Sequence, residues 1–333
     1  MTDGRTSPMI QPPAADSRPV LLRTIGLTKR FGSIVAVDGL DLDVRAGEVL
    51  GFLGPNGSGK STTVGMILGL IAPAAGRIEF HGRDLAEQRS LATRAIGAII
   101  ETPAFYPFLS GRDNLRALAI AAGGVPTGYI EDLLRLVGLT ERAGSQFKTY
   151  SLGMKQRLGI ASTLLTDPEF VILDEPTNGL DPAGQREIRE LIPMLARQGR
   201  AVLLASHLLN EVQQVCDRVA IIRRGRLIQT GTVAELVRRD AHLEVILPAS
   251  DLERAAVIVR TLSFVGEVTT VGGRLRIVAP IDQGAAINRA LAEGGLYAGA
   301  IIPRQSTLED VFLELTEDDQ PVAGKGADVP TAA

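Results

Sequence analysis

Tryptophan is absent from this 333-residue chain, aromatic residues make up only 4% of it, and cysteine occurs once, as Cys216. A single cysteine excludes an internal disulfide bond and suits a reducing compartment. Because it lies in a helix-like stretch that leads into apolar residues, we expect it to be a small buried hydrophobe. With 45% hydrophobic residues, the composition is that of a globular α/β protein whose core is packed by aliphatic side chains.

Long apolar runs are also missing. No stretch reaches the roughly 18 apolar residues that a membrane-spanning helix requires, and residues 1–20 lack the apolar run of a signal peptide. Any role at a membrane would therefore depend on a partner chain. The formal net charge is −3, from 35 basic and 38 acidic residues, which argues against broad electrostatic capture of nucleic acid.

Four regions are predicted along the chain. Residues 1–20 and 318–333 have the composition of flexible tails. Residues 21–240 alternate near-continuous apolar runs with helical segments, the pattern of an α/β fold with a mostly parallel sheet. The candidate core strands of this large domain are 49–53, 95–100, 170–174, 201–205 and 219–222.

Residues 241–317 are predicted to form a small C-terminal α/β domain. Its elements follow the order βαββαβ with one more helix at the end, which matches a ferredoxin-like arrangement. We expect strands at 242–247, 267–271, 274–279 and 296–302, and helices at 251–265, 281–294 and 306–317.

The most informative segment reads GPNGSGKST, with an apolar run before it and a helix-compatible run after it. This is the pattern of a phosphate-binding loop, in which glycines let backbone N–H groups point at phosphate oxygens. A chance glycine-rich turn would lack the strand before and the helix after. We expect Lys60 to reach the β- and γ-phosphates of ATP and the Ser61 hydroxyl to ligand Mg²⁺. The predicted nucleotide-binding residues are Gly54, Pro55, Asn56, Gly57, Ser58, Gly59, Lys60, Ser61 and Thr62.

Two carboxylates follow the apolar run 170–173, as Asp174 and Glu175. They could mark only a strand that ends at the solvent edge, but a buried strand that ends in two acids is costly unless a cation or a proton needs them. Beside a phosphate loop, Asp174 suits coordination of Mg²⁺, directly or through water. Glu175 is then placed to orient and deprotonate the attacking water.

A histidine, His207, follows the apolar run 201–205 in the same way. A lone histidine is more often structural than catalytic. At the carboxyl end of a parallel strand, however, it can face the same γ-phosphate as the two acids. We therefore predict Glu175 and His207 as the catalytic pair.

In order and spacing, these motifs resemble the nucleotide-binding subunit of ATP-binding cassette (ABC) transporters over residues 21–238. The resemblance implies a P-loop ATPase domain with a mostly parallel core sheet, an antiparallel β subdomain and a helical subdomain. It also implies that Phe31 stacks on adenine, that His207 is the switch histidine, and that Asp181, in the D-loop of residues 178–181, lies at a dimer contact.

Two departures from the family pattern stand out. The signature segment, usually LSGGQ, reads YSLGMKQR over residues 150–157 and keeps Ser151 and Gly153. As a helix N-cap and an open backbone, these two can still bind the γ-phosphate held by another subunit. Glu101 stands where most members carry glutamine, and its carboxylate can coordinate Mg²⁺. Both changes resemble the subgroup of bacitracin- and lantibiotic-resistance exporters.

The resemblance implies two protein partners. One signature and one phosphate loop per chain predict a head-to-tail dimer with a second copy, because each signature must act on the other chain's ATP. A separate multi-spanning membrane permease would hold the dimer at the cytoplasmic face of the membrane, peripherally. Residues 103–108 are rich in aromatics and proline, and this segment is either a locally packed loop or the socket for a permease helix. No nucleic-acid partner is expected.

Two other functions stay open at this point. A soluble ABC ATPase could act on a ribosome or a nucleic acid, although such relatives join two cassettes or insert long coiled coils, which are absent from this sequence. The altered signature could instead mark a catalytically weak regulatory subunit.

Overall fold

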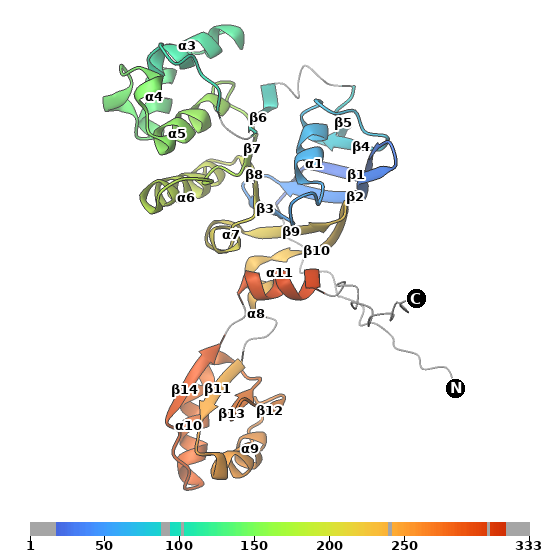
Figure 1. The fold of residues 1–333 in the computed structure, drawn as a ribbon, viewed down its shortest axis with the longest axis vertical. Coiled ribbons are helices and arrows are strands. Elements are labelled where there is room, and N and C mark those ends of the chain that lie inside the picture. The colour runs from blue at the N-terminus through green and yellow to red at the C-terminus, as the bar shows by residue number, and fades with distance from the viewer. Residues whose placement is uncertain (1–17, 88–93, 101–102, 239–241, 305–306, 318–333) are drawn as a thin grey trace, which may run out of the picture. The chain divides into compact units, whose positions relative to one another are not determined.

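The computed structural model describes residues 18–87, 94–100, 103–238, 242–304 and 307–317. By its internal contacts the chain divides into two units, Met1–Glu235 and Leu236–Ala333 (Figure 1). Most of the two predicted tails, and Glu101, lie outside the described residues. Within the described part of the chain, no helix combines the length and the apolar character needed to cross a membrane.

The first unit is built on a six-stranded sheet with the strand order β10-β9-β3-β8-β7-β6. The pairs β9–β3, β3–β8, β8–β7 and β7–β6 are parallel, and only β10 runs antiparallel to its neighbour. All residues of the three central strands are buried, as expected for a sheet covered on both faces. The strands are β3 (Val49–Leu53), β6 (Ile96–Ile99), β7 (Phe170–Asp174), β8 (Ala201–Ser206), β9 (Arg218–Arg223) and β10 (Arg226–Thr232).

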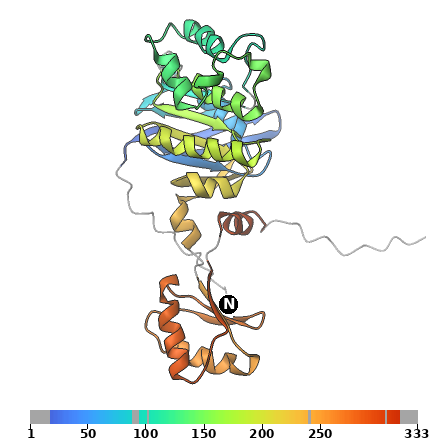
Figure 2. The ribbon, with the colours of Figure 1, turned by 90° about the vertical axis from the view of Figure 1, so that its left-hand side faces the viewer.

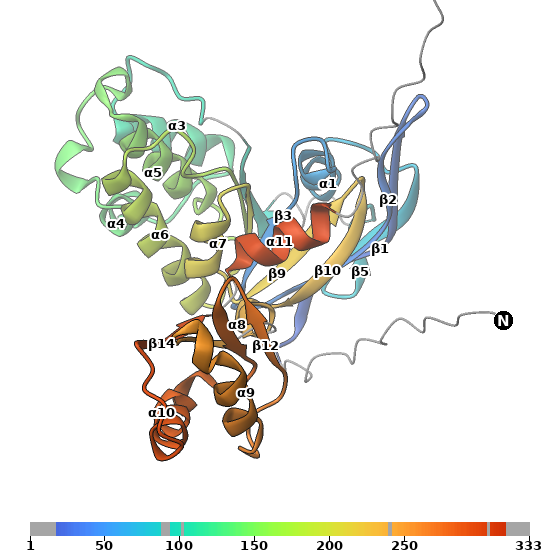
Figure 3. The ribbon, with the colours of Figure 1, turned by 60° about the horizontal axis from the view of Figure 1, so that its bottom comes forward.

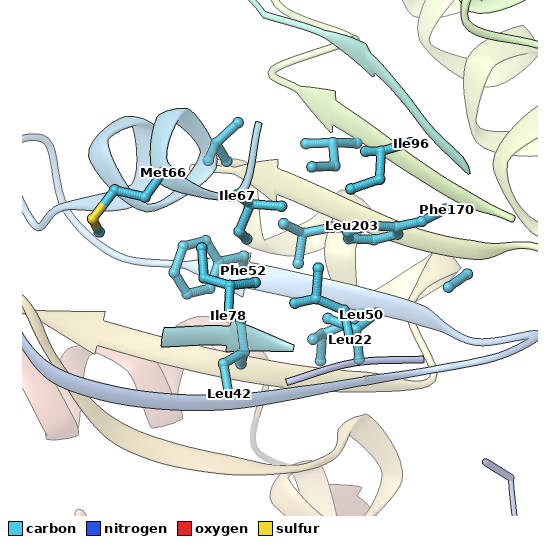
Figure 4. Packing of buried hydrophobic residues seen from close by; sticks show 14 of the residues in the cluster. Leu22, Leu42, Leu50, Phe52, Met66, Ile67, Ile78, Ile96, Phe170 and Leu203 are labelled. Atoms are coloured by element: carbon cyan, nitrogen blue, oxygen red, sulfur yellow. The ribbon is translucent and has the colours of Figure 1, made fainter. Parts of the chain in front are cut away.

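One face of this sheet packs against α1 (Lys60–Ile67) and a second, antiparallel sheet. The core between them contains Phe52 and Leu50 of β3 with Ile67 of α1, as Figure 4 shows. Leu22, Leu42 and Ile78 come from the second sheet and enter the same core. That sheet has the order β2-β1-β4-β5, with β1 (Val20–Phe31), β2 (Ile34–Arg45), β4 (Ala75–Phe80) and β5 (Arg83–Asp84).

The other face is covered by α6 (Pro182–Arg197) and α7 (Leu209–Val215), and α6 lies in front of the strands in Figure 2. Figures 1 and 3 show α1 and α6 on opposite sides of the core sheet. A side chain at Gly51 of β3 would overlap Val212 of α7 and touch the sulfur of Cys216. Cys216 is buried directly after α7, as predicted, and burial raises the pKa of its thiol well above the usual value.

A helical part is inserted between β6 and β7. It contains α3 (Gly111–Ala121), α4 (Tyr129–Leu136) and α5 (Leu152–Thr163), which pack against one another. α5 also packs on β6 so closely that a Cβ at Gly97 would overlap the backbone oxygen of Thr163. The predicted fold class, a mostly parallel core sheet with antiparallel and helical subdomains, is confirmed.

The second unit has its own sheet and core. The sheet order is β12-β13-β11-β14 and all three pairs are antiparallel. This is the split βαβ topology of ferredoxin-like folds. Leu243 and Leu275 of the sheet and Ile287 of α10 are fully or almost fully buried in one cluster. Helix α8 (Val233–Arg238) contains the boundary between the two units. The elements that follow it are β11 (His242–Ile246), α9 (Leu252–Arg260), β12 (Val268–Val271), β13 (Arg274–Ile277), α10 (Gly284–Glu293), β14 (Ala300–Arg304) and α11 (Leu308–Glu317).

Candidate nucleotide-binding and hydrolysis site

Strand register brings the predicted site residues to one edge of the core sheet. Leu53, the last residue of β3, pairs with Ser206, the last of β8. Asp174, the last of β7, pairs with Ala205 of β8. The carboxyl ends of three adjacent parallel strands are therefore level. The phosphate loop follows β3, Glu175 follows β7 and His207 follows β8. All three therefore lie at the edge where such sheets bind ligands.

The loop between β3 and α1 has the backbone that its glycines allow. Gly57 and Gly59 have φ values of +78° and +108°, a region that residues with a Cβ rarely adopt. A Cβ at Gly54 would overlap the backbone oxygen of Ile222. Pro55, Asn56, Gly57 and Ser61 are exposed, Thr62 is half-buried, and Ser58, Gly59 and Lys60 are buried.

Lys60 is the buried cation of the loop. Its Nζ donates hydrogen bonds to the carbonyl oxygens of Gly54 at 2.6 Å and Pro55 at 3.3 Å. Burial lowers the pKa of Lys60, and the nearby carboxylates of Glu175 and Asp174 act in the opposite direction. The charges of the loop lysine and of the two acids therefore lie close enough to interact.

Glu175 and His207 lie in direct contact. Nδ1 of His207 is 2.8 Å from Oε2 of Glu175, and the Ser206 hydroxyl donates a weaker bond to the same oxygen at 3.4 Å. His207 is half exposed, whereas Asp174 is buried. The imidazole therefore holds one carboxylate oxygen of Glu175, and a carboxylate held in this way can also accept a hydrogen bond from a water molecule.

The backbone at Glu175 is itself unusual. Its φ is +49°, a conformation that costs roughly 1–3 kcal/mol for a residue other than glycine. The Glu175 N–H donates to the oxygen of Ala205 at 2.9 Å, so β8 holds the turn in place. Strain of this kind is concentrated at functional sites, because the surrounding structure must maintain it.

The predicted signature and D-loop residues both lie at helix starts. Ser151 is the N-cap of α5, and its hydroxyl accepts a hydrogen bond from the Met154 N–H at 3.2 Å. Asp181 caps α6 in the same way, through a bond from the Gly184 N–H at 3.0 Å. Ser151 is exposed and Gly153 half-buried. The N-terminus of α5 therefore presents backbone N–H groups of the kind that bind anions.

Phe31 ends β1 at a position pairing with Ile34 on β2. Its ring is 49% exposed, and the ammonium of Lys29 lies 5.1 Å from the ring centroid. An exposed aromatic face of this kind can accept a flat heterocycle. Lys29 was not among the predicted residues, because nothing in the sequence marks which side chain covers the ring.

The described residues contain no group of three or more His, Cys, Asp or Glu side chains arranged to hold a metal ion by themselves. Mg²⁺ is usually bound through one or two side chains together with the phosphates of a substrate. Ser61 and Asp174 are the described residues predicted for that role. The third, Glu101, lies outside the described residues.

Comparisons with known proteins show which chains this one resembles. Residues 37–178 match the family model described as "ABC transporter". The bacitracin transport ATP-binding protein BcrA of Bacillus licheniformis is 39% identical over 89% of this chain and 97% of its own length. A daunorubicin resistance ATP-binding protein of Streptomyces coeruleorubidus is 37% identical over 89% of this chain and 96% of its own. A solved ATP-binding subunit of an ABC transporter superposes with a TM-score of 0.59 at 32% identity, covering 66% of this chain and 92% of that one.

Proposed function

The chain belongs to the family of ATP-binding subunits of ABC transporters, and we propose that two copies of it bind two MgATP molecules head to tail and drive an exporter. Binding of ATP, its hydrolysis and the powering of a transporter are shared by this family. The alternative, a soluble ATPase acting on a ribosome or nucleic acid, is not favoured, because the relatives that match along nearly their whole length are transport and resistance subunits.

One observation carries the catalytic proposal: the level ends of β3, β7 and β8 place Lys60, Glu175 and His207 at one edge. Lys60 would neutralise charge on the β- and γ-phosphates. Glu175 would accept the proton of the attacking water, and His207 would hold the carboxylate through the 2.8 Å contact. Mg²⁺, bound by Ser61 and Asp174, would supply further neutralisation of phosphate charge.

The dimer completes each site. In the first unit, α1 and α5 lie on opposite sides of the core sheet (Figures 1 and 3), and Ser151 is the N-cap of α5. The exposed N-cap Ser151 and the adjacent Leu152, 41% exposed, are free to meet a second copy. The positive end of the α5 dipole would then face the γ-phosphate held by that copy.

Replacing Glu175 by Gln tests the catalytic proposal. The amide keeps the shape of the side chain and cannot act as a base, so we expect hydrolysis to fall by about 100-fold or more while ATP still binds. Gel filtration with ATP should then show a stable dimer. The matched control is Glu169→Gln, an exposed carboxylate just before β7, at the opposite end of the same strand. Hydrolysis at the wild-type rate in Glu175→Gln would refute the assignment of the base.

A patch on the helical part is the proposed socket for the membrane subunit. Tyr106, Phe108 and Ile120 are 65%, 70% and 78% exposed, and large apolar side chains that gather on a surface mark interaction sites. Phe105, by contrast, packs inward on Phe147 at 5.0 Å between ring centroids, so the loop is both locally packed and outwardly apolar. Docking there would hold the chain peripherally at the cytoplasmic face of the membrane.

The partner proposal is tested by co-expression with the multi-spanning membrane protein that is encoded next to this chain. The wild-type chain should be recovered in the membrane fraction with it, and Phe108→Asp should be recovered there several-fold less. Tyr297→Asp, which changes an equally exposed aromatic in the second unit (79%), is the control. Equal recovery of both variants would refute the socket.

The relatives named for bacitracin, daunorubicin and lantibiotics make antibiotics the proposed class of cargo.

A further inference from the structure

A second, buried bridge lies behind the contact between Glu175 and His207. The hydroxyl of Thr177 donates a hydrogen bond to Oε2 of Glu211. Thr177 is 2% exposed and Glu211 is 7% exposed, so both polar groups have been removed from water. The other carboxylate oxygen of Glu211, Oε1, is buried and has no hydrogen-bond partner among the described residues.

This bridge joins the same two segments as the contact at the surface. Thr177 comes two residues after Glu175, and Glu211 comes four residues after His207, in the first turn of α7. The two side-chain bonds therefore close a ring through the turn after β7 and the turn after β8. The backbone bond from the Glu175 N–H to the oxygen of Ala205 holds the start of the turn, and the bond between Thr177 and Glu211 fixes the turn two residues further on.

The energetics argue against a merely stabilising role. A buried carboxylate with one oxygen unpaired keeps a large part of its desolvation cost. Two apolar side chains of the same shape would usually stabilise the fold at least as well. What the polar pair supplies is direction, because a hydrogen bond fixes the distance and angle between the two segments.

We propose that Glu211 is a positioning residue for hydrolysis, acting through Thr177. The bond fixes the turn that starts at Glu175, and so it holds that carboxylate against His207. The same segment continues to Asp181, the N-cap of α6, so the D-loop is anchored by the same bond. The proposal rests on the catalytic roles proposed for Glu175 and His207.

Thr177→Val is the sharpest test, because valine has nearly the shape of threonine and cannot donate the bond. We expect kcat to fall about tenfold or more, since small displacements of a catalytic group are costly, with KM for ATP within twofold of wild type. Thr177→Ser keeps the hydroxyl and should restore most of kcat. Glu211→Leu should match Thr177→Val, and the double variant should be no slower than either single variant.

Three results would overturn the proposal. A wild-type kcat in Thr177→Val would show that the bond does not matter. If Thr177→Ser were as slow as Thr177→Val, the methyl packing and not the hydrogen bond would be responsible. If kcat, ATP affinity and melting temperature fell together and the two single effects added, the pair would be structural only. Failure of the proposed base is distinguishable, because it appears as an active Glu175→Gln enzyme whatever these variants do.

Discussion

Two glycines of the phosphate loop allow the conformational and steric requirements of that loop to be separated. Gly57 and Gly59 both have positive φ, +78° and +108°. A Cβ at Gly57 would have no neighbour within 4 Å, whereas one at Gly59 would overlap the carbonyl oxygen of Ala36 and approach Val37 Cγ2 to 3.3 Å. Alanine at either site carries the cost of a left-handed backbone, roughly 1–2 kcal/mol. Only alanine at Gly59 also forces backbone to move.

We therefore expect Gly57→Ala to lower the free energy of unfolding by about 1–2 kcal/mol. Gly59→Ala should lower it by a further 1–3 kcal/mol or so, the usual cost of overpacking a close contact. Because both glycines also bear on phosphate binding, the assay is urea denaturation without nucleotide. The chain has no tryptophan, so far-UV circular dichroism is the signal. Equal losses in the two variants would refute the steric part of the reasoning.

Two further predictions concern the proposed adenine contact of Phe31 and Glu48 at the amino end of the core sheet. Phe31→Ala should weaken ATP binding by about 1 kcal/mol or more, the usual contribution of one stacked base. The same substitution should barely change the free energy of unfolding. The control is Ile34→Ala, which changes the exposed cross-strand neighbour, and equal ATP affinities of the two variants in calorimetry would contradict the prediction. Glu48, fully buried before β3, accepts from Arg218 at 2.9 Å, yet burial raises its pKa. A raised folded-state pKa gives stability that is present below the unfolded value and lost as pH rises through the folded value. Glu48→Gln removes that loss. In denaturation experiments from pH 4 to 7, the free energy of unfolding of the variant should therefore rise relative to that of the wild type. A difference between the two that stays constant with pH would contradict the direction of this prediction.

The hydrolysis edge could be predicted because parallel strands place their carboxyl ends at the same side of a sheet. Three apolar runs followed by Gly54, Glu175 and His207 were therefore sufficient to bring these residues together. The Thr177–Glu211 bridge could not be predicted in this way. Thr177 lies in the turn after β7 and Glu211 in the first turn of helix α7, and the sequence does not state which of these side chains point toward each other and which toward solvent.

Boundaries were harder to predict where turns, not apolar periodicity, decide them. β14 was expected from residue 296 and begins at Ala300, because Gly295 adopts φ +74° and the chain rejoins β11 only at Gly299, which donates to Ile246 at 2.9 Å. The second unit was expected from residue 241, and the division by contacts falls between Glu235 and Leu236.

The helical part connects the proposed socket to the signature segment by direct ring contacts. Phe105 packs on Phe147 at 5.0 Å, and Phe147 packs on Tyr150 at 5.9 Å between centroids. Tyr150 is tied to the oxygen of Arg142 at 2.7 Å and directly precedes Ser151, the N-cap of α5. Packed rings resist relative displacement because interiors are as dense as organic crystals. A membrane subunit that moves Phe105 would therefore move the end of α5 that is proposed to meet the γ-phosphate, and closure of the dimer would act on the membrane subunit by the same contacts.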